Sequence, residues 1–249
     1  MNKFEDYEEK VRKLVKEGKT TSEIGKELEI PYTTIRSWCK RLDIKAKKGK
    51  TGKEVYKFNR RYFKDIDTEE KAYWLGFIYA DGNISNYKVR VQLQGKDKEH
   101  LVKFAKAIGF PRIREYERNG KGYCSIRITS IEMVDDLKEL GMGEGKTFNI
   151  RMPHIRKDLI RHFARGFFDG DGSIGNRTDT KAIYMLGLRS FLEELNKSLK
   201  LPFEIPLKNR KDKDARLAYF QIYGKKAQEY LRVLYEDSTI HLDRKKELV

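Results

Sequence analysis

The spacing of apolar and polar residues predicts two matching helices in this chain. The stretches YWLGFIYADG at 73–82 and HFARGFFDGDG at 162–172 are both apolar helix patterns that end in an acid followed by a glycine. In each copy, two small residues stand four positions apart and form a groove that lets another backbone approach closely. These residues are Gly76 and Ala80 in the first copy and Gly166 and Gly170 in the second. The two helices are therefore predicted to pack together through their small residues.

The pattern around these helices predicts the same order of elements twice. The first copy has an alternating strand at 88–94, a helix at 96–107, strands at 112–118 and 123–130 joined by the hairpin signal Asn119-Gly120, and a helix at 131–140. The looser second copy has a strand at 182–188, a helix at 190–200, strands at 203–208 and 217–223, and a helix at 225–235. The chain is thus predicted to contain a duplicated α+β unit. A duplication implies a pseudo-twofold axis, which suits a partner that is itself twofold, such as duplex DNA.

The first 44 residues carry a different pattern, which predicts three short helices. Apolar periodicity predicts helices at 5–16 and 31–42, and a capping box from Thr20 to Glu23 opens a shorter helix between them. The arrangement resembles a helix-turn-helix domain, whose last helix enters the major groove of DNA. The outward face of that helix is polar and basic, with Tyr32, Thr33, Thr34, Arg36, Ser37 and Lys40. An ordinary helical cap with a solvated face is the alternative.

A change of composition marks the domain boundaries. The stretch KAKKGKTGK at 45–53 has no apolar periodicity, so we expect a basic linker over 45–55. This linker either follows a phosphate backbone or is a soluble tether. It separates a small all-α domain at 1–44 from the duplicated region, which divides into halves at 56–150 and 151–249.

The charge of the chain indicates the kind of partner. Lys and Arg total 54 against 38 Asp and Glu, a formal net charge of +16, while 39% of the residues are hydrophobic. This combination is typical of a folded protein with a polyanionic partner, and double-stranded DNA is the leading candidate. An anionic membrane surface is the alternative, but the chain has no polybasic amphipathic helix or lipidation motif to support it. No signal peptide and no run of ~18 apolar residues is present, so we expect a cytoplasmic protein that associates with the nucleoid when it binds DNA.

The acids that end the two predicted helices suggest a metal site. If the helices pack together, Asp81 and Asp171 arrive side by side next to Gly82 and Gly172, which are expected to be left-handed caps. A helix C-terminus already presents carbonyl oxygens and the negative end of the helix dipole, so two further anions need a cation between them. Carboxylate and carbonyl oxygens favour Mg²⁺, with Mn²⁺ as a substitute. Cys39 and Cys124 have no partner at metal-ligand spacing, and we expect both to be reduced and partly buried.

The alternating strand in the first half predicts a DNA-contacting face. Lys88, Arg90, Gln92 and Gln94 share one side of it, and Arg127 lies on a second alternating strand. Arg and Gln side chains are suited to bidentate contact with base edges, so a sheet that presents them could lie in a groove.

Both motifs resemble the signature of the LAGLIDADG homing endonucleases, in the arrangement where one chain carries two copies. The resemblance covers about residues 56–249, and it implies a duplicated αββαββα fold with pseudo-twofold symmetry and a saddle of strands over DNA. It also implies that Asp81 and Asp171 bind divalent metal for cleavage of both strands and that the carbonyls of Ala80 and Gly170 complete the ligation. We expect a monomer, because both halves lie in one chain.

The resemblance further implies an assisting basic residue near each acid. The tail TIHLDRKKE suggests Lys245 for this role, with Lys246 as the alternative, and GKTFNIRMP suggests Lys146. The second motif departs from the family pattern at Ala164 and Arg165, where apolar residues are usual. We therefore expect that helix to be more solvated at its start.

Asp169 is an additional acid in the second motif. Its counterpart in the first motif is Tyr79, which is not acidic, so Asp169 is expected to face the surface. Three functions remain open: a sequence-specific DNA endonuclease, a regulator that binds DNA without cleaving it, and an RNA maturase. The presence of both motif acids favours cleavage, and a helix-turn-helix suits B-form DNA better than RNA.

Overall fold

The computed structural model of the protein describes residues 4–46, 56–143, 145, 149–177, 180–209 and 214–249. The chain divides into two compact units, Met1–Val55 and Tyr56–Val249. This boundary falls at the end of the basic stretch that the composition marks as a linker. None of the described helices is long and apolar enough to cross a membrane.

The first unit contains the three predicted helices. They are α1 (Glu8–Lys16), which follows a single 3-10 turn, α2 (Thr21–Glu27) and α3 (Tyr32–Arg41). Thr20 caps α2. Its hydroxyl accepts from the backbone N–H of Glu23 at 3.2 Å, and the Glu23 carboxylate accepts from the backbone N–H of Thr20 at 2.8 Å, which confirms the predicted capping box. The core of this unit consists of Val11, Leu14, Ile24, Ile35 and Cys39. Cys39 here and Cys124 in the second unit are both buried, where we expected partial burial.

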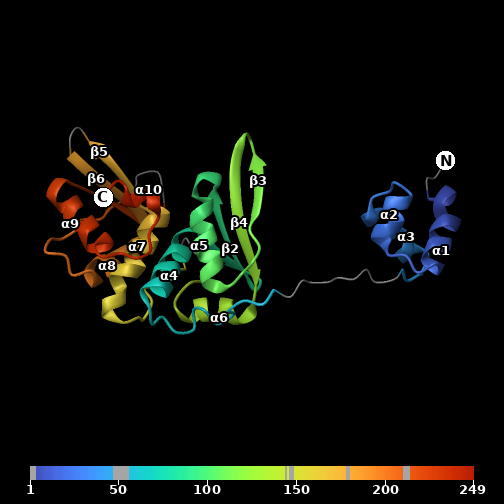
Figure 1. Cartoon of the computed structure of the whole chain (residues 1–249), viewed down its shortest axis with the longest axis horizontal. Helices are drawn as coiled ribbons and strands as arrows, with labels where there is room; N and C mark the ends of the chain where they lie inside the picture. The colour runs from blue at the N-terminus through green and yellow to red at the C-terminus, as the bar shows by residue number, and fades with distance from the viewer. Residues whose placement is uncertain (1–3, 47–55, 144, 146–148, 178–179, 210–213) are drawn as a thin grey trace. The chain divides into compact units, whose positions relative to one another are not determined.

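The second unit contains two four-stranded antiparallel sheets, which confirms the predicted α+β class (Figure 1). The first half consists of α4 (Glu69–Asp81), β1 (Gly82–Ser85), β2 (Lys88–Gln94), α5 (Lys98–Ile108), β3 (Arg114–Arg118), β4 (Lys121–Thr129) and α6 (Ile131–Glu139). The second half consists of α7 (Ile160–Asp171), β5 (Ser173–Arg177), β6 (Thr180–Leu188), α8 (Arg189–Ser198), β7 (Lys208–Asn209), β8 (Leu217–Tyr223), α9 (Gly224–Tyr235) and α10 (Asp243–Lys246). The strand orders, β1-β2-β4-β3 and β5-β6-β8-β7, are the same, so the two halves are true structural repeats.

Strand alternation decides which side of each sheet faces the core. Val89, Val91 and Leu93 of β2 are buried against the helices, and the residues between them face the other side. The predicted hairpin joins β3 and β4, where Asn119 and Gly120 both have positive φ values of 53° and 69°. Strand β7 has two described residues, fewer than the strand predicted at 203–208, and α10 is a helix that the apolar pattern did not predict.

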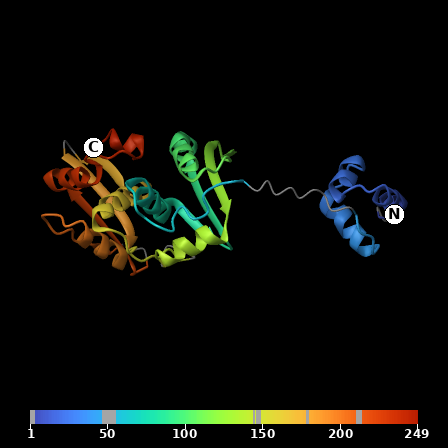
Figure 2. The same cartoon turned by 60° about the horizontal axis from the view of Figure 1, so that its bottom comes forward.

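Helices α4 and α7 lie side by side between the two sheets (Figures 1 and 2). Every residue from Ala72 to Ala80 is buried, because α4 is apolar all round and has neighbours on every side. A single hydrophobic core runs through both halves and contains both helices.

The glycines that follow the two helices are not left-handed caps, and this prediction was wrong. Gly82 and Gly172 both have φ of −78° with extended ψ. Glycine is required here by lack of space. A Cβ on Gly82 would lie 2.5 Å from the carbonyl oxygen of Ile78, and one on Gly172 would lie 2.3 Å from the ring of Phe168.

Candidate active site

The small residues of α4 and α7 bring the two helices into backbone contact, as the sequence predicts. A Cβ on Gly76 would lie 1.9 Å from the carbonyl oxygen of Phe163. The contact is reciprocal, since a Cβ on Gly166 would lie 1.9 Å from the carbonyl oxygen of Tyr73. Each glycine therefore receives the backbone of the other helix, and the pair is symmetric at this level.

The two motif ends meet at Gly170. The Cβ of Ala80 lies 2.2 Å from the position that a Cβ of Gly170 would take, and Oδ2 of Asp81 lies 3.3 Å from the same point. Asp171 is the next residue along α7 and is exposed, whereas Asp81 is half-buried. The structure thus brings Asp81, Asp171, Ala80 and Gly170 together at the C-terminal ends of both helices.

The donor set at this point fits a hard divalent cation. The carboxylate of Asp81 occupies space beside Gly170 that any side chain there would fill, and Asp171 is the next residue of α7. The described part of the chain holds no group of three or more His, Cys, Asp or Glu residues suited to a metal ion. Two carboxylates alone do not complete a coordination sphere. The remaining ligands must be carbonyl oxygens, water or groups of a bound partner.

Lys245 lies at the C-terminal end of α7, where α10 inserts its ammonium group. Nζ donates to the carbonyl oxygens of Phe168, Asp169 and Gly172 at 2.6, 2.7 and 2.5 Å. The side chain is buried, with 4% of its surface exposed. All three ammonium hydrogens are therefore engaged with the last turn of the helix, and Lys245 is the cation that compensates the negative end of α7.

Burial lowers the pKa of Lys245 to about 8. The carboxylate of Asp169 opposes this effect, and Asp81 and Asp171 do so more weakly. The donors of Lys245 point into the protein, towards the backbone carbonyl groups at the end of α7.

The other predicted basic residues are placed differently. Nζ of Lys246 donates to the carbonyl oxygen of Tyr235 at 2.9 Å, at the end of α9. Lys146 lies outside the described residues. Catalytic roles for these lysines remain predictions.

Asp169 is buried, so the prediction that it faces the surface was wrong. Its carboxylate accepts hydrogen bonds from the Tyr73 hydroxyl and from the Leu242 backbone N–H, each at 2.7 Å, and from the Tyr235 hydroxyl. Burial raises the pKa of Asp169, and the hydrogen bonds from Tyr235 and Tyr73 oppose this rise. The residue links α4, α9 and the C-terminal tail beneath the motif ends.

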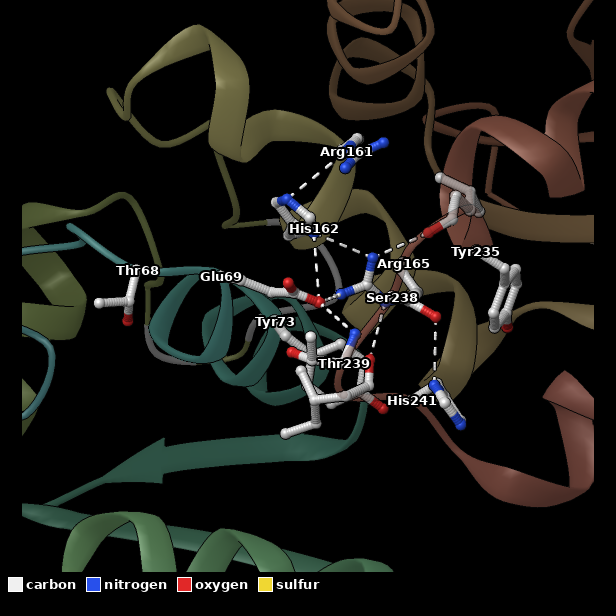
Figure 3. A network of polar contacts seen from close by, with 12 residues as sticks. Thr68, Glu69, Tyr73, Arg161, His162, Arg165, Tyr235, Ser238, Thr239 and His241 are labelled. Atoms are coloured by element: carbon white, nitrogen blue, oxygen red, sulfur yellow. Dashed lines mark hydrogen bonds and ion pairs between the residues drawn. The ribbon is translucent and has the colours of Figure 1, made fainter.

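The start of the second motif is also buried, which contradicts the expected solvation. Ala164 and Arg165 are both fully inaccessible. Nη2 of Arg165 pairs with Oε1 of Glu69 at 2.6 Å, and its other nitrogens donate to the carbonyl oxygens of Leu234 and Ile240, both at 2.8 Å (Figure 3). The guanidinium is buried because these acceptors satisfy it.

The tail after α9 connects the second half to the first. Glu69 at the start of α4 accepts a hydrogen bond from the Thr239 backbone N–H at 2.9 Å. Asp243 pairs with Lys103 of α5 at 2.8 Å. These contacts hold the tail and α10 against α4 and α5 of the first half, and no periodic signal in the sequence predicts them.

Arg244 is a cation of the C-terminal tail whose contact with the first half the sequence does not predict. Its Nε and Nη2 atoms donate to the carboxylate of Asp97 at 2.8 and 3.1 Å. Asp97 raises the pKa of Arg244, and the carboxylates of Asp169 and Asp81 raise it further. Arg244 therefore joins the C-terminal tail of the second half to the first half.

The residues predicted to contact DNA lie on open surfaces. Lys88, Arg90, Gln92 and Gln94 alternate with the buried residues of β2, and Arg90 is paired directly opposite Arg127 of β4. In the first unit, the outward face of α3 is exposed except at Thr34, which is half-buried, and Tyr32 has 58% of its surface exposed. The alternation and amphipathicity behind these predictions are confirmed, while contact with DNA remains a prediction.

Comparison with known proteins supports the fold. No family model matches the chain. It is 28% identical over 178 residues to the replication factor C small subunit of Methanocaldococcus jannaschii, which is 68% of this chain but only 10% of that protein. It is 24% identical over 225 residues to an uncharacterized protein of the same organism, covering 83% of this chain and 75% of the relative.

Among solved structures, the homing endonuclease I-WcaI bound to its DNA recognition sequence matches with a TM-score of 0.55 and 15% identity, over 81% of this chain and 95% of the other. The N-terminal LAGLIDADG domain of DUF199/WhiA matches with a TM-score of 0.47 and 19% identity, over 76% of this chain and 93% of the other. Together with the repeated α4–α7 pair and the two matching sheets, the first of these likenesses shows that the chain has the fold of the LAGLIDADG homing endonucleases.

Proposed function

We propose that the chain is a metal-dependent, sequence-specific endonuclease of the homing type that cuts both strands of duplex DNA. The observation that carries this proposal is the meeting of the two motif ends, where Oδ2 of Asp81 lies 3.3 Å from the vacant Cβ position of Gly170, the residue before Asp171. Carboxylates at the negative end of a helix favour a bound cation there.

The residues of the site would have different roles. Asp81 and Asp171, with the carbonyl groups of Ala80 and Gly170, would hold Mg²⁺ or Mn²⁺. The bound metal would supply positive charge to stabilise the phosphoryl oxygens as a phosphodiester bond is hydrolysed. The reciprocal glycine contacts of α4 and α7 set the distance between the acids, so one acid serves each strand.

The surroundings of the acids position them. Lys245 neutralises the end of α7 and fixes its last carbonyl groups, which include that of Gly172. Arg244, held by Asp97, adds positive charge near Asp81, where a phosphate would approach. The chain would act as a monomer. The basic face of its first sheet would bind DNA, and the three-helix unit would extend the contact with DNA.

A DNA-binding regulator without cleavage is the second candidate. The observation that favours it is the geometry of Lys245, whose three donors all contact backbone carbonyls and leave none for a substrate. The two candidates differ in whether the motif acids bind metal and break DNA.

The deciding experiment selects sites from a randomised duplex library, separately for binding in Ca²⁺ and for cleavage in Mg²⁺. We expect Asp81→Asn and Asp171→Asn each to abolish double-strand cleavage and to leave binding of the selected duplex within about threefold. Calorimetric titration of Mn²⁺ into the full chain should show binding that either substitution weakens.

Asp135→Asn is the matched control, because it removes an exposed carboxylate of α6 and leaves both motif acids in place. It should cleave and bind Mn²⁺ as the unmodified chain does. Binding without cleavage by the unmodified chain would overturn the endonuclease in favour of the regulator. Normal cleavage by either motif variant would instead overturn the role proposed for the motif acids.

A further inference from the structure

The open faces of the two sheets differ in chemistry although their topology is the same. Register places six cations on the open face of the first sheet: Lys88, Arg90, Arg114, Arg118, Lys121 and Arg127. None of the strand residues described on this face is acidic, because Glu115 and Glu117 alternate to the other side. The face is therefore strongly positive.

The cations of the first sheet also lie directly opposite one another. Arg90 is paired with Arg127, and Arg118 is paired with Lys121 at the hairpin. Like charges opposite each other destabilise a sheet unless an anion lies between them. Gln92 and Gln94 continue the same row with groups that both donate and accept.

The open face of the second sheet is aromatic and aliphatic. Tyr184 and Leu186 of β6 face Gln221 and Tyr219 of β8, and the rings of Tyr184 and Tyr219 lie 5.4 Å apart. Register places two cations, Arg177 and Lys208, on the strands of this face, against six on the first. Most of its polar groups are therefore hydroxyls and an amide rather than charges.

The second face also carries small residues between β5 and β6. Gly175 is paired with Ala182, and a Cβ on Gly175 would have no neighbour within 4 Å. A surface of small and aromatic residues suits close approach to apolar groups. In the major groove, the apolar group that a base presents is the C5-methyl of thymine.

We propose that the two sheets read different bases: the first sheet binds a guanine-bearing half-site through its arginines, and the second binds a thymine-bearing half-site through apolar contact. The inference rests on the proposed function in taking duplex DNA as the ligand of both faces. Arg contacts O6 and N7 of guanine bidentately, whereas tyrosine rings and leucine side chains pack against methyl groups. The first half then provides most of the salt-dependent affinity, and the second provides affinity that salt changes little.

Base analogues test this assignment on the full chain and the duplex selected for binding in Ca²⁺. 7-Deazaguanine, which lacks the N7 acceptor, should weaken binding by about 5- to 150-fold when placed in one half-site and have little effect in the other. Deoxyuridine, which lacks the thymine methyl, should weaken binding by about fourfold per contacted base in the opposite half-site only.

Variants assign each half-site to its sheet. Arg127→Gln should remove the response to 7-deazaguanine and keep the response to deoxyuridine, because the effects of two changes at one contact do not add. Tyr219→Ser should do the reverse. Tyr116→Ser is the matched control: it breaks the Tyr116–Tyr123 ring pair on the first sheet, at 5.7 Å between centroids, and should leave the deoxyuridine response unchanged.

Salt dependence gives an independent readout. Arg118→Gln should lower the slope of log K against log salt by about one unit, whereas Tyr219→Ser should lower affinity at an unchanged slope. Equal responses of both half-sites to each analogue, or responses coupled to the opposite sheets, would overturn the inference. Failure to bind any duplex would instead overturn the proposed function, and urea unfolding of each variant identifies loss of fold.

Discussion

The two motif helices are alike where they touch and different where they end. Gly76 of α4 and Gly166 of α7 make the same backbone contact, with the same 1.9 Å clearance for an added Cβ. At the end of α4, the Tyr79 hydroxyl donates to the carbonyl oxygen of Leu140 at 2.6 Å. At the corresponding position of α7 stands Asp169, which is buried among three donors.

The backbones of the two halves therefore follow a pseudo-twofold symmetry, whereas the charged groups at the two helix ends do not. Asp169 adds a buried charge to the second half, and Lys245 inserts its ammonium group beside it. Each of these charges lowers the free-energy cost of burying the other, since a buried charge needs a partner and satisfied hydrogen bonds. The C-terminal tail that carries Lys245 is thus an asymmetric addition to a symmetric frame.

The largest expected effect on the free energy of unfolding comes from the glycine contacts, in which the two helices are alike. Gly76→Ala and Gly166→Ala should each lower the free energy of unfolding by at least about 3 kcal/mol, because a Cβ would overlap the backbone of the other helix. Urea denaturation measures this effect, and Gly175→Ala, which has open space, is the control. Unequal costs for the two glycines would show that the helix contact itself is asymmetric.

The next effect addresses the end of α7. Lys245→Met should lower the free energy of unfolding by about 3 kcal/mol, because it leaves the last carbonyls of the helix and the buried Asp169 without their cation. Lys246→Met, which loses a hydrogen bond to a single carbonyl, should cost much less. The double variant Lys245→Met with Asp169→Asn should lose less free energy of unfolding than the two single variants lose in sum. Full additivity of the two losses would contradict the coupling of these residues.

A smaller effect comes from two buried histidines, His100 of α5, which contacts α4, and His162 of α7 itself. Burial lowers the pKa of His100 from 6.5 to about 3, and it lowers that of His162 to about 4. Both pKa values are depressed in the folded state, so the stability that the neutral rings contribute is complete above pH 6.5 and is lost as the pH falls towards the folded values. We expect the more deeply buried His100 to account for up to about 2 kcal/mol of the loss between pH 7 and pH 5.

Urea denaturation at pH 7 and pH 5 measures this loss. His100→Gln keeps a polar partner for the Tyr73 hydroxyl, which lies 2.9 Å from the ring of His100, and should reduce the pH dependence. The same dependence in the variant would assign the loss to His162 or to other groups.

The smallest effect concerns the end of α4. Tyr79→Phe should lower the free energy of unfolding by about 1 kcal/mol, the contribution of one hydrogen bond. The loss in free energy of unfolding caused by Tyr79→Phe, compared with the loss caused by Lys245→Met, measures how far the two helix ends differ. Equal costs would contradict the asymmetry.

Several features of the site could be predicted because they depend on local periodicity. The acids Asp81 and Asp171 stand at the same place in two copies of one helix pattern, and the pairs of small residues mark the faces that meet. The alternating strand at 88–94 likewise separates the buried residues from the open ones. Side chains whose direction follows from the period of the element were therefore placed correctly.

The features that were missed depend on contacts between residues far apart in the chain. Asp169 and Arg165 look solvent-exposed as residue types, but the structure buries them because groups about 70 or more residues away satisfy them: Leu242, Tyr235, Tyr73 and Glu69. The caps at Gly82 and Gly172 were predicted from residue type, whereas crowding by the preceding turn requires glycine in an extended conformation there.

The sequence by itself determined the duplication, the α+β class, the helix pair and the location of the two acids, because each follows from a repeated pattern of short period. Only the tertiary structure decided how the tail returns to the helix ends, where Lys245 and Arg244 point, and that the two sheets present different chemistry. These depend on long-range packing, in which the free energy of burying a polar group is set by partners that no local pattern specifies.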